Sequence, residues 1–216
     1  MKKREKVFWV FCATVVLFVS VMWESGLTAF AVDNKVRVVD GATAVNMILP
    51  TYGTCFMGNQ TVYSDGTGSF RNAPQVYDLM ARSGYDLWIS ANEGEMSVTI
   101  ENYDNKNADL YNMPDDAIKK FFGSLDAQLR QAMTRQGVTV NDVKTDIVKY
   151  DKNKYLRVKM EADPPYSEVY QYCTLKQNKM ITIRLICYNK VADINSYALN
   201  PNNIVGNISI ERIAAK

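Results

Sequence analysis

Histidine is absent from this sequence of 216 residues. Its absence excludes Ser–His–Asp and Cys–His catalysis, because both need an imidazole as the general base. It also excludes the zinc sites that are built on histidine ligands. The motifs Ser-x-x-Lys and Gly-x-Ser-x-Gly, typical of common serine enzymes, do not occur either. We therefore expect no catalytic residue, no metal site and no cofactor, and we predict that the protein is not an enzyme.

The sequence also lacks a hydrophobic run of the length that a transmembrane helix needs. Its longest apolar stretch, residues 7–22, has about 16 residues, whereas a spanning helix needs about 20. Four basic residues precede this stretch, and Ala29-Phe30-Ala31 provides the small residues of a signal-peptidase site. We interpret residues 1–31 as a signal peptide and residues 32–216 as a single secreted or extracytoplasmic domain. The alternative is an uncleaved anchor, which would confine any membrane contact to this first segment.

The predicted mature domain has no excess of charge of either sign. Residues 1–31 contain four basic and two acidic residues, which leaves 21 of each from the totals of 25 and 23. A nucleic-acid-binding domain needs a concentration of Lys and Arg to neutralise phosphates. We therefore expect no nucleic-acid partner.

Cysteine is scarce as well, and three of the four cysteines lie in the predicted mature domain. Cys173 and Cys187 would lie about five residues apart along a predicted hairpin, which is too far for a disulfide. In an exported protein, a disulfide between Cys55 and either of them remains open. We favour the interpretation that all three are small buried apolar residues.

Apolar residues recur with helical periodicity in residues 113–137 and predict one long amphipathic helix. Pro114, Asp115 and Asp116 are typical of a helix start, and Gly137 is typical of a helix end. Gly123 falls inside this helix, where we expect a close packing contact. The predicted apolar stripe consists of Ile118, Phe121, Phe122, Leu125, Leu129, Ala132 and Met133.

The rest of the domain is predicted to be mainly antiparallel strands. Alternating patterns and turn residues predict strands at 36–39, 42–49, 85–91, 96–102, 143–150, 155–162, 166–175, 180–188 and within 204–213. A short helix is predicted at 74–82, and residues 51–72 and 104–112 are predicted to form irregular segments. The order predicts an α+β fold in which an antiparallel β-sheet packs against the long amphipathic helix and the shorter helix.

The register of the 166–188 hairpin stays open at this point. If Leu175 pairs with Met180, then Tyr170 and Tyr172 share a face with neighbouring apolar residues of the second strand. A one-residue slip would reverse the faces, because side chains in a strand alternate with a period of two. The slipped register would place Val169, Cys173 and Leu175 on that face instead.

Five stretches carry a resemblance to a known family. They are NMILP (46–50), MSVTIEN (96–102), MPDDAIKKFF (113–122), YSEVYQYCTLKQNKMITIRLIC (166–187) and IVGNISI (204–210). In their order, the chain resembles the PsbP-like α/β/α sandwich superfamily over most of residues 36–213. The resemblance implies a PsbP-like sandwich and a binding or accessory domain without a shared catalytic site. No functional residue is carried over, since the metal-linked histidines of the plant proteins have no counterpart in this sequence.

Tyrosine is abundant, with thirteen residues, and four tyrosines lie in or beside the predicted loops. They are Tyr52, Tyr63, Tyr103 and Tyr111. Amphipathic aromatic rings in such places are typical of contact surfaces. We predict that these four form a binding face for another protein or a cell-envelope component, and that the protein is a non-catalytic binding or accessory domain.

Two other functions remain open at the level of the sequence. One is a small-molecule or carbohydrate binder with a pocket between helix and sheet. The other is a hydrolase that uses two carboxylates, for which Glu93, Glu95, Glu101 and Asp104 are the nearest cluster. Because Glu93 and Glu95 flank Gly94, we interpret them as residues of a solvated turn.

Overall fold

The computed structural model describes residues 35–48, 54–57, 62–63, 74–91, 94–104, 108–135, 137–151, 153–188 and 201–213. The predicted signal peptide and Tyr52 lie outside these residues. Within them, no helix has both the length and the apolar character needed to cross a membrane.

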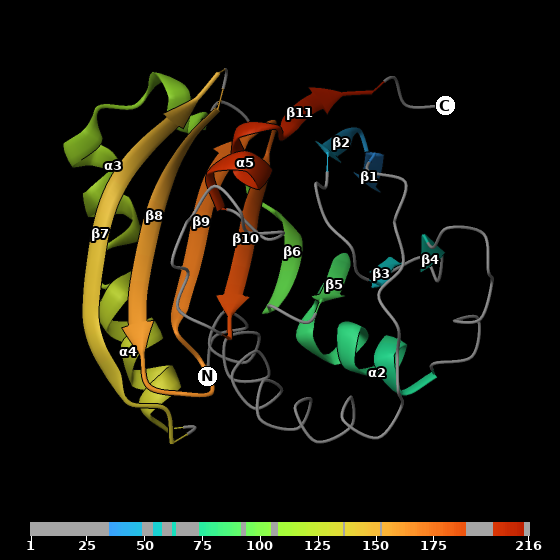
Figure 1. Ribbon diagram of the computed structural model, residues 1–216. Helices are drawn as coiled ribbons and strands as arrows, with labels where there is room; N and C mark the ends of the chain where they lie inside the picture. The colour runs from blue at the N-terminus through green and yellow to red at the C-terminus, as the bar shows by residue number, and fades with distance from the viewer. Residues whose placement is uncertain are drawn as a thin grey trace.

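The described chain forms a mixed α/β fold with two antiparallel sheets (Figure 1). The larger sheet has eight strands in the order β4-β3-β5-β6-β10-β9-β8-β7. Their bounds are β3 (Thr54–Met57), β4 (Val62–Tyr63), β5 (Leu87–Ala91), β6 (Gly94–Asn102), β7 (Val140–Tyr150), β8 (Asn153–Ala162), β9 (Glu168–Lys176) and β10 (Lys179–Cys187). The smaller sheet consists of β1 (Lys35–Asp40), β2 (Thr43–Ile48) and β11 (Ser209–Arg212), in the order β1-β2-β11.

Five helical elements connect or cover these strands in the described residues. They are α2 (Pro74–Ser83), the 3-10 turn η1 (Leu110–Asn112), α3 (Asp115–Phe122), α4 (Leu125–Arg135) and α5 (Pro201–Gly206). The short helix predicted at 74–82 and the hairpins predicted around 40–41 and 92–95 are confirmed. The irregular segment predicted at 51–72 is wrong in part, because β3 and β4 lie in it and extend the larger sheet beyond β5.

The long amphipathic helix predicted for residues 113–137 is wrong as a single element. Gly123 ends α3 with φ 55° and ψ −120°, a conformation that residues with a Cβ rarely adopt. Its N–H donates to Lys119 O at 2.9 Å, and α4 begins two residues later. The packing contact expected at Gly123 is also wrong, because a Cβ there would meet nothing closer than Lys120 O at 3.9 Å. The acidic first turn, Asp115 and Asp116, is confirmed.

The open register of the β9–β10 hairpin is the one that pairs Leu175 with Met180. Gln177 and Asn178 form the two-residue turn with φ of 53° and 66°. This turn matches the right-handed twist of the flanking strands, which favours two-residue hairpins with positive φ. Tyr170 and Tyr172 therefore lie opposite Leu185 and Ile183.

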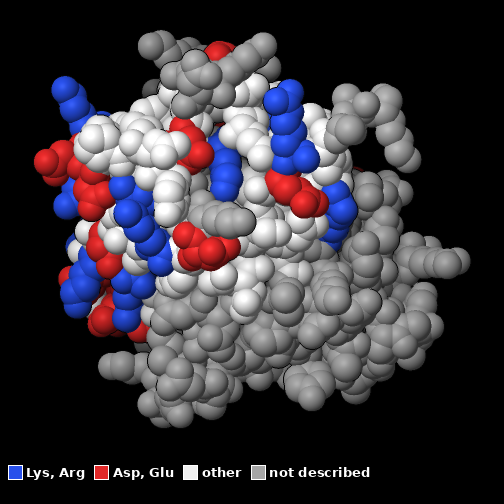
Figure 2. Space-filling model, turned by 90° about the horizontal axis from the view of Figure 1, so that it is seen from above, with Lys and Arg blue, Asp and Glu red and all other residues white. Residues whose placement is uncertain are grey.

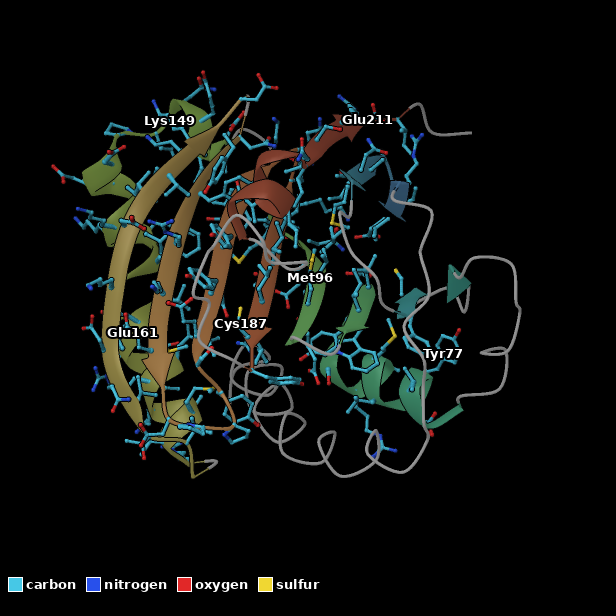
Figure 3. The ribbon with its side chains drawn as sticks, in the orientation of Figure 1. Tyr77, Met96, Lys149, Glu161, Cys187 and Glu211 are labelled. Atoms are coloured by element: carbon cyan, nitrogen blue, oxygen red, sulfur yellow. The ribbon has the colours of Figure 1, made fainter. Side chains whose placement is uncertain are left out.

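Each face of the larger sheet has its own cover. Helix α4 packs Leu129 and Met133 on one face, together with Val158, Met160, Val169 and Ile186. Helix α5 and the smaller sheet pack on the other face, where the buried cluster includes Val45, Ile210, Ile204, Val205, Tyr155, Tyr170, Tyr172 and Ile183. In Figure 1, α4 lies behind β7 and β8, α5 lies in front of β9 and β10, and the smaller sheet lies above and to the right of β10. Figure 3 marks both ends of the outer strands, with Lys149 near the end of β7 and Glu161 near the end of β8.

Candidate binding surface

Tyr103 and Phe121 form an aromatic contact on the surface of the molecule. Tyr103 follows β6, and its N–H donates to Asn178 O in the β9–β10 turn at 2.7 Å. Its ring meets the ring of Phe121 edge to face, with centroids 5.6 Å apart and an interplanar angle of 82°. Phe121 keeps 38% of its surface exposed. Tyr103 is partly buried, so Phe121 provides the exposed apolar area of this pair.

Tyr111 is the second exposed aromatic residue of this region. It lies in η1, is 45% exposed, and its N–H is capped by Asp109 Oδ1 at 2.9 Å. The ammonium group of Lys149, on β7, lies 5.7 Å from the centre of its ring. A cation–π contact at an exposed site contributes about 0.5–1 kcal/mol. The contact therefore orients the ring without burying it.

A buried hydrophobic cluster supports these exposed rings from below. Leu110 and Ile118 are fully buried against Leu156 of β8 and Leu175 of β9, and Tyr103, Met113 and Phe122 pack around them. Burial of aliphatic side chains of this size stabilises a fold by about 1.5–3 kcal/mol each. The segment 108–122 is therefore anchored to the sheet.

A buried lysine also holds the start of α3 in place. The side chain of Lys154, on β8, is only 4% exposed, and its Nζ donates to Asp115 Oδ1 at 2.6 Å and to Met113 O at 2.7 Å. The hydrogen bond from Lys154 lowers the pKa of Asp115. Two partners satisfy the buried ammonium group, which would otherwise be costly.

The four tyrosines predicted to form the binding face lie in different parts of the chain, and the structure describes only some of them fully. Tyr103 lies against Phe121, and Tyr111 lies against Lys149; both tyrosines belong to the segment that connects β6 to α3. Tyr63 lies in β4, where its backbone pairs with Cys55, and its side chain is outside the description. Tyr52 is outside the described residues. Phe121 belongs to the predicted apolar stripe, but it keeps 38% of its surface exposed, so the sequence alone did not identify it as a surface residue.

The interpretation of Glu95 as a residue of a solvated turn is wrong. Glu95 lies inside β6, is 9% exposed and accepts a hydrogen bond from Tyr188 Oη. Burial raises the pKa of its carboxyl group, against the effect of hydrogen bonds from Tyr188 and Trp88. Glu101, on the same face of β6, is six residues away, or roughly 20 Å at about 3.3 Å per residue. Glycosidase carboxylates lie about 5–9.5 Å apart, so these two residues do not form such a pair.

Asp86 is a second carboxylate that is at least partly buried. It precedes β5, and its Oδ2 accepts the N–H of Ile100 at 2.6 Å. Burial raises its pKa from 3.8 to about 6. Asp40 and Glu101 act in the same direction, and Lys179 acts against them. The ionised form of Asp86 is therefore less favourable in the folded state than in the unfolded chain.

We expect this carboxylate to make stability depend on pH. Because its pKa is raised by folding, its contribution is fully present below about pH 3.8 and is lost as the pH rises to about 6. Asp86→Asn keeps an acceptor for Ile100 and removes the charge. We expect it to raise the free energy of unfolding at pH 7 by about 1–2 kcal/mol, after allowance for solvent screening, and to change little at pH 4. Urea unfolding at both pH values measures this change in the free energy of unfolding, and the exposed Asp78→Asn is the control. If Asp86→Asn had the same effect at both pH values, the predicted pH dependence would be contradicted.

Cys55, Cys173 and Cys187 are buried free thiols, as favoured from the sequence. Burial raises the pKa of Cys55 and of Cys187 to about 12, so neither thiol is ionised near neutral pH. A neutral buried thiol is neither a nucleophile nor a ready metal ligand. The described residues contain no group of three or more acidic or cysteine side chains placed to hold a metal ion.

Comparisons with known proteins give one informative result. No protein-family model matches the sequence. No curated protein matches it either. The chain is similar in structure to the solution structure of cyanobacterial PsbP from Synechocystis sp. PCC 6803, with a TM-score of 0.45 and 10% sequence identity, over 87% of this chain and 99% of that one. At this level the likeness concerns the fold and brings no ligand or activity to the chain.

Proposed function

We propose that this chain is an exported, non-catalytic binding domain that contacts another protein through Tyr103, Tyr111 and Phe121. Export rests on the signal-peptide pattern of residues 1–31. The observation that carries the binding role is the exposure of Tyr111 and Phe121, 45% and 38%, on a segment that a buried cluster and Lys154 anchor to the sheet. Exposed aromatic anchors on a rigid base are typical of the centres of protein interfaces.

A protein partner fits this surface better than a small molecule in the space between helix and sheet. Side chains fill the region between α3 and the sheet, where Leu110, Ile118, Leu156 and Leu175 are each at most 2% exposed. Charges of both signs surround the aromatic rings, since Lys119, Lys120 and Lys149 are exposed beside the carboxylates of the first turn of α3. This combination of an apolar centre and a mixed polar rim is the usual composition of a protein interface.

The test is capture of a partner by the full chain expressed in its producing cell. Crosslinking and mass spectrometry identify proteins bound to the wild-type chain, and binding is then measured with the purified partner. We expect Tyr111→Ala combined with Phe121→Ala to weaken that binding by at least about 30-fold, because interface hot spots contribute about 2 kcal/mol or more.

The matched control is Val39→Ala. Val39 is an apolar residue of β1 that is 52% exposed, so its replacement removes exposed apolar area outside the aromatic segment, although less of it than the double variant removes. We expect this variant to bind as the wild type does. Equal binding by the double variant and the wild type would refute the proposed surface.

A further inference from the structure

The outer edge of β7 has no neighbouring strand among the described residues (Figure 1). β7 is 11 residues long, whereas β4, at the other border of the sheet, has two residues. A long border strand presents backbone N–H and C=O groups that can pair with a further strand. β7 contains no proline, and its one register irregularity against β8 lies at its start, between Val140 and Asp142. Nearly the whole edge is therefore suited to pairing.

The charges of β7 carry both signs and alternate with uncharged residues. Asp142, Lys144 and Asp146 point to one face, with side chains that are 46%, 71% and 48% exposed. The other face carries Val143, Thr145 and Ile147. Border strands that resist pairing commonly carry charges such as lysine, which keep other chains away. On β7, Lys144 lies between two aspartates, so a second copy can meet it with an opposite charge. Figure 2 shows basic and acidic side chains interspersed on the side of the molecule where β7 and α3 lie.

We propose that two copies of this chain associate by antiparallel pairing of β7 with β7, with Thr145 on the two-fold axis. This register pairs the regular part of the strand after its irregular start, because Asp142 then lies opposite Val148 of the partner subunit. It places Lys144 opposite Asp146 of the partner subunit, and the symmetry repeats this pair. On the other face, Val143 lies opposite Ile147 of the partner subunit. Opposite charges and apolar side chains placed directly across two strands are favourable.

The neighbouring registers are unfavourable, which makes the pairing specific. Residues that face each other across an antiparallel pair point to the same side, so the register can shift only in steps of two. One such shift places Lys144 opposite the same lysine of the second copy, and the opposite shift does this for Asp146. Like charges directly opposite each other are destabilising. A single strand pair buries a small area, so we expect weak and concentration-dependent association.

A cysteine on the two-fold axis tests the register. Directly opposed residues of antiparallel strands have Cα atoms about 4.5–5.5 Å apart, within the range that a disulfide bridges. We expect Thr145→Cys to form a covalent dimer under mild oxidation by glutathione disulfide. Lys149→Cys is the control, because Lys149 would lie opposite Asn141 of the partner subunit and far from its own copy. Equal crosslinking at both positions, or none at position 145, would overturn the proposal.

Charge reversal tests the same interface without a crosslink. Lys144→Glu sets two carboxylates opposite each other at both symmetric positions, and we expect at least about tenfold weaker self-association in sedimentation equilibrium. Lys119→Glu changes the same charge on α3 and should leave self-association unchanged. A wild-type chain that stays monomeric up to about 1 mM, which corresponds to a very weak affinity, would refute the dimer.

Discussion

Replacing Gly94 with alanine should destabilise the protein by about 3 kcal/mol. Gly94 starts β6 opposite Cys187 of β10, and a Cβ at this position would lie 2.0 Å from Ile186 O. That oxygen belongs to the backbone of a strand that is paired on both sides, with β6 and with β9. Neither strand has freedom to move away, so the clash must be relieved by distortion of the sheet. Urea unfolding followed by circular dichroism measures the loss.

Gly84 provides the control for this experiment. It ends α2 with φ 69°, and no heavy atom lies within 4 Å of the position of its Cβ. Gly84→Ala therefore introduces only the cost of a left-handed conformation, about 1 kcal/mol. If Gly94→Ala costs no more than Gly84→Ala, the close approach of β6 and β10 is not as the structure has it.

Ile118→Ala should cost about 3 kcal/mol, because it leaves a cavity beneath α3. Ile118 is fully buried between Leu110, Leu156 and Leu175. The loss of its side chain removes apolar contacts that anchor the binding surface to β8 and β9. We also expect the segment 108–122 to loosen before the rest of the protein unfolds. The fluorescence of the surrounding tyrosines should then change at denaturant concentrations below the main unfolding transition.

Two variants of α3 separate this cavity effect from other causes. Ile118→Val removes a single methylene group and should cost about 0.5–1.5 kcal/mol. Phe121→Ala, on the exposed side of the same helix, should cost less than about 1 kcal/mol. An Ile118→Ala variant as stable as Phe121→Ala would contradict the packing of α3 on the sheet.

Local patterns in the sequence predicted most of the strands of this fold. The strands after α4 have alternating apolar residues, and their hairpins have turn residues that tolerate positive φ, such as Asn178. These signals depend only on neighbours along the chain, so they are readable without the partner strand. Short strands such as β4 and β3 were missed, because two to four residues show no recognisable period.

The break between α3 and α4 shows the limit of the same reasoning. Apolar spacing continues across Gly123, so the pattern predicts one helix, and glycine inside a helix is tolerated at a cost of about 1 kcal/mol. The positive φ of Gly123 is a backbone property that the spacing does not contain. Phe121 belongs to the predicted apolar stripe, and the structure leaves it partly exposed.

By itself, the sequence determined that this chain has no histidine, where its long strands lie and two of the tyrosines on its candidate surface. Composition excludes catalysis that needs histidine, and periodicity reports which residues can share a face. Only the tertiary structure decided the β9–β10 register, the burial of Glu95 and the contact of Lys149 with Tyr111. The burial of Glu95 and the contact of Lys149 with Tyr111 join residues far apart in the chain, and the hairpin register depends on which of its faces packs on the core. Their energies come from packing and desolvation in three dimensions, which no local pattern records.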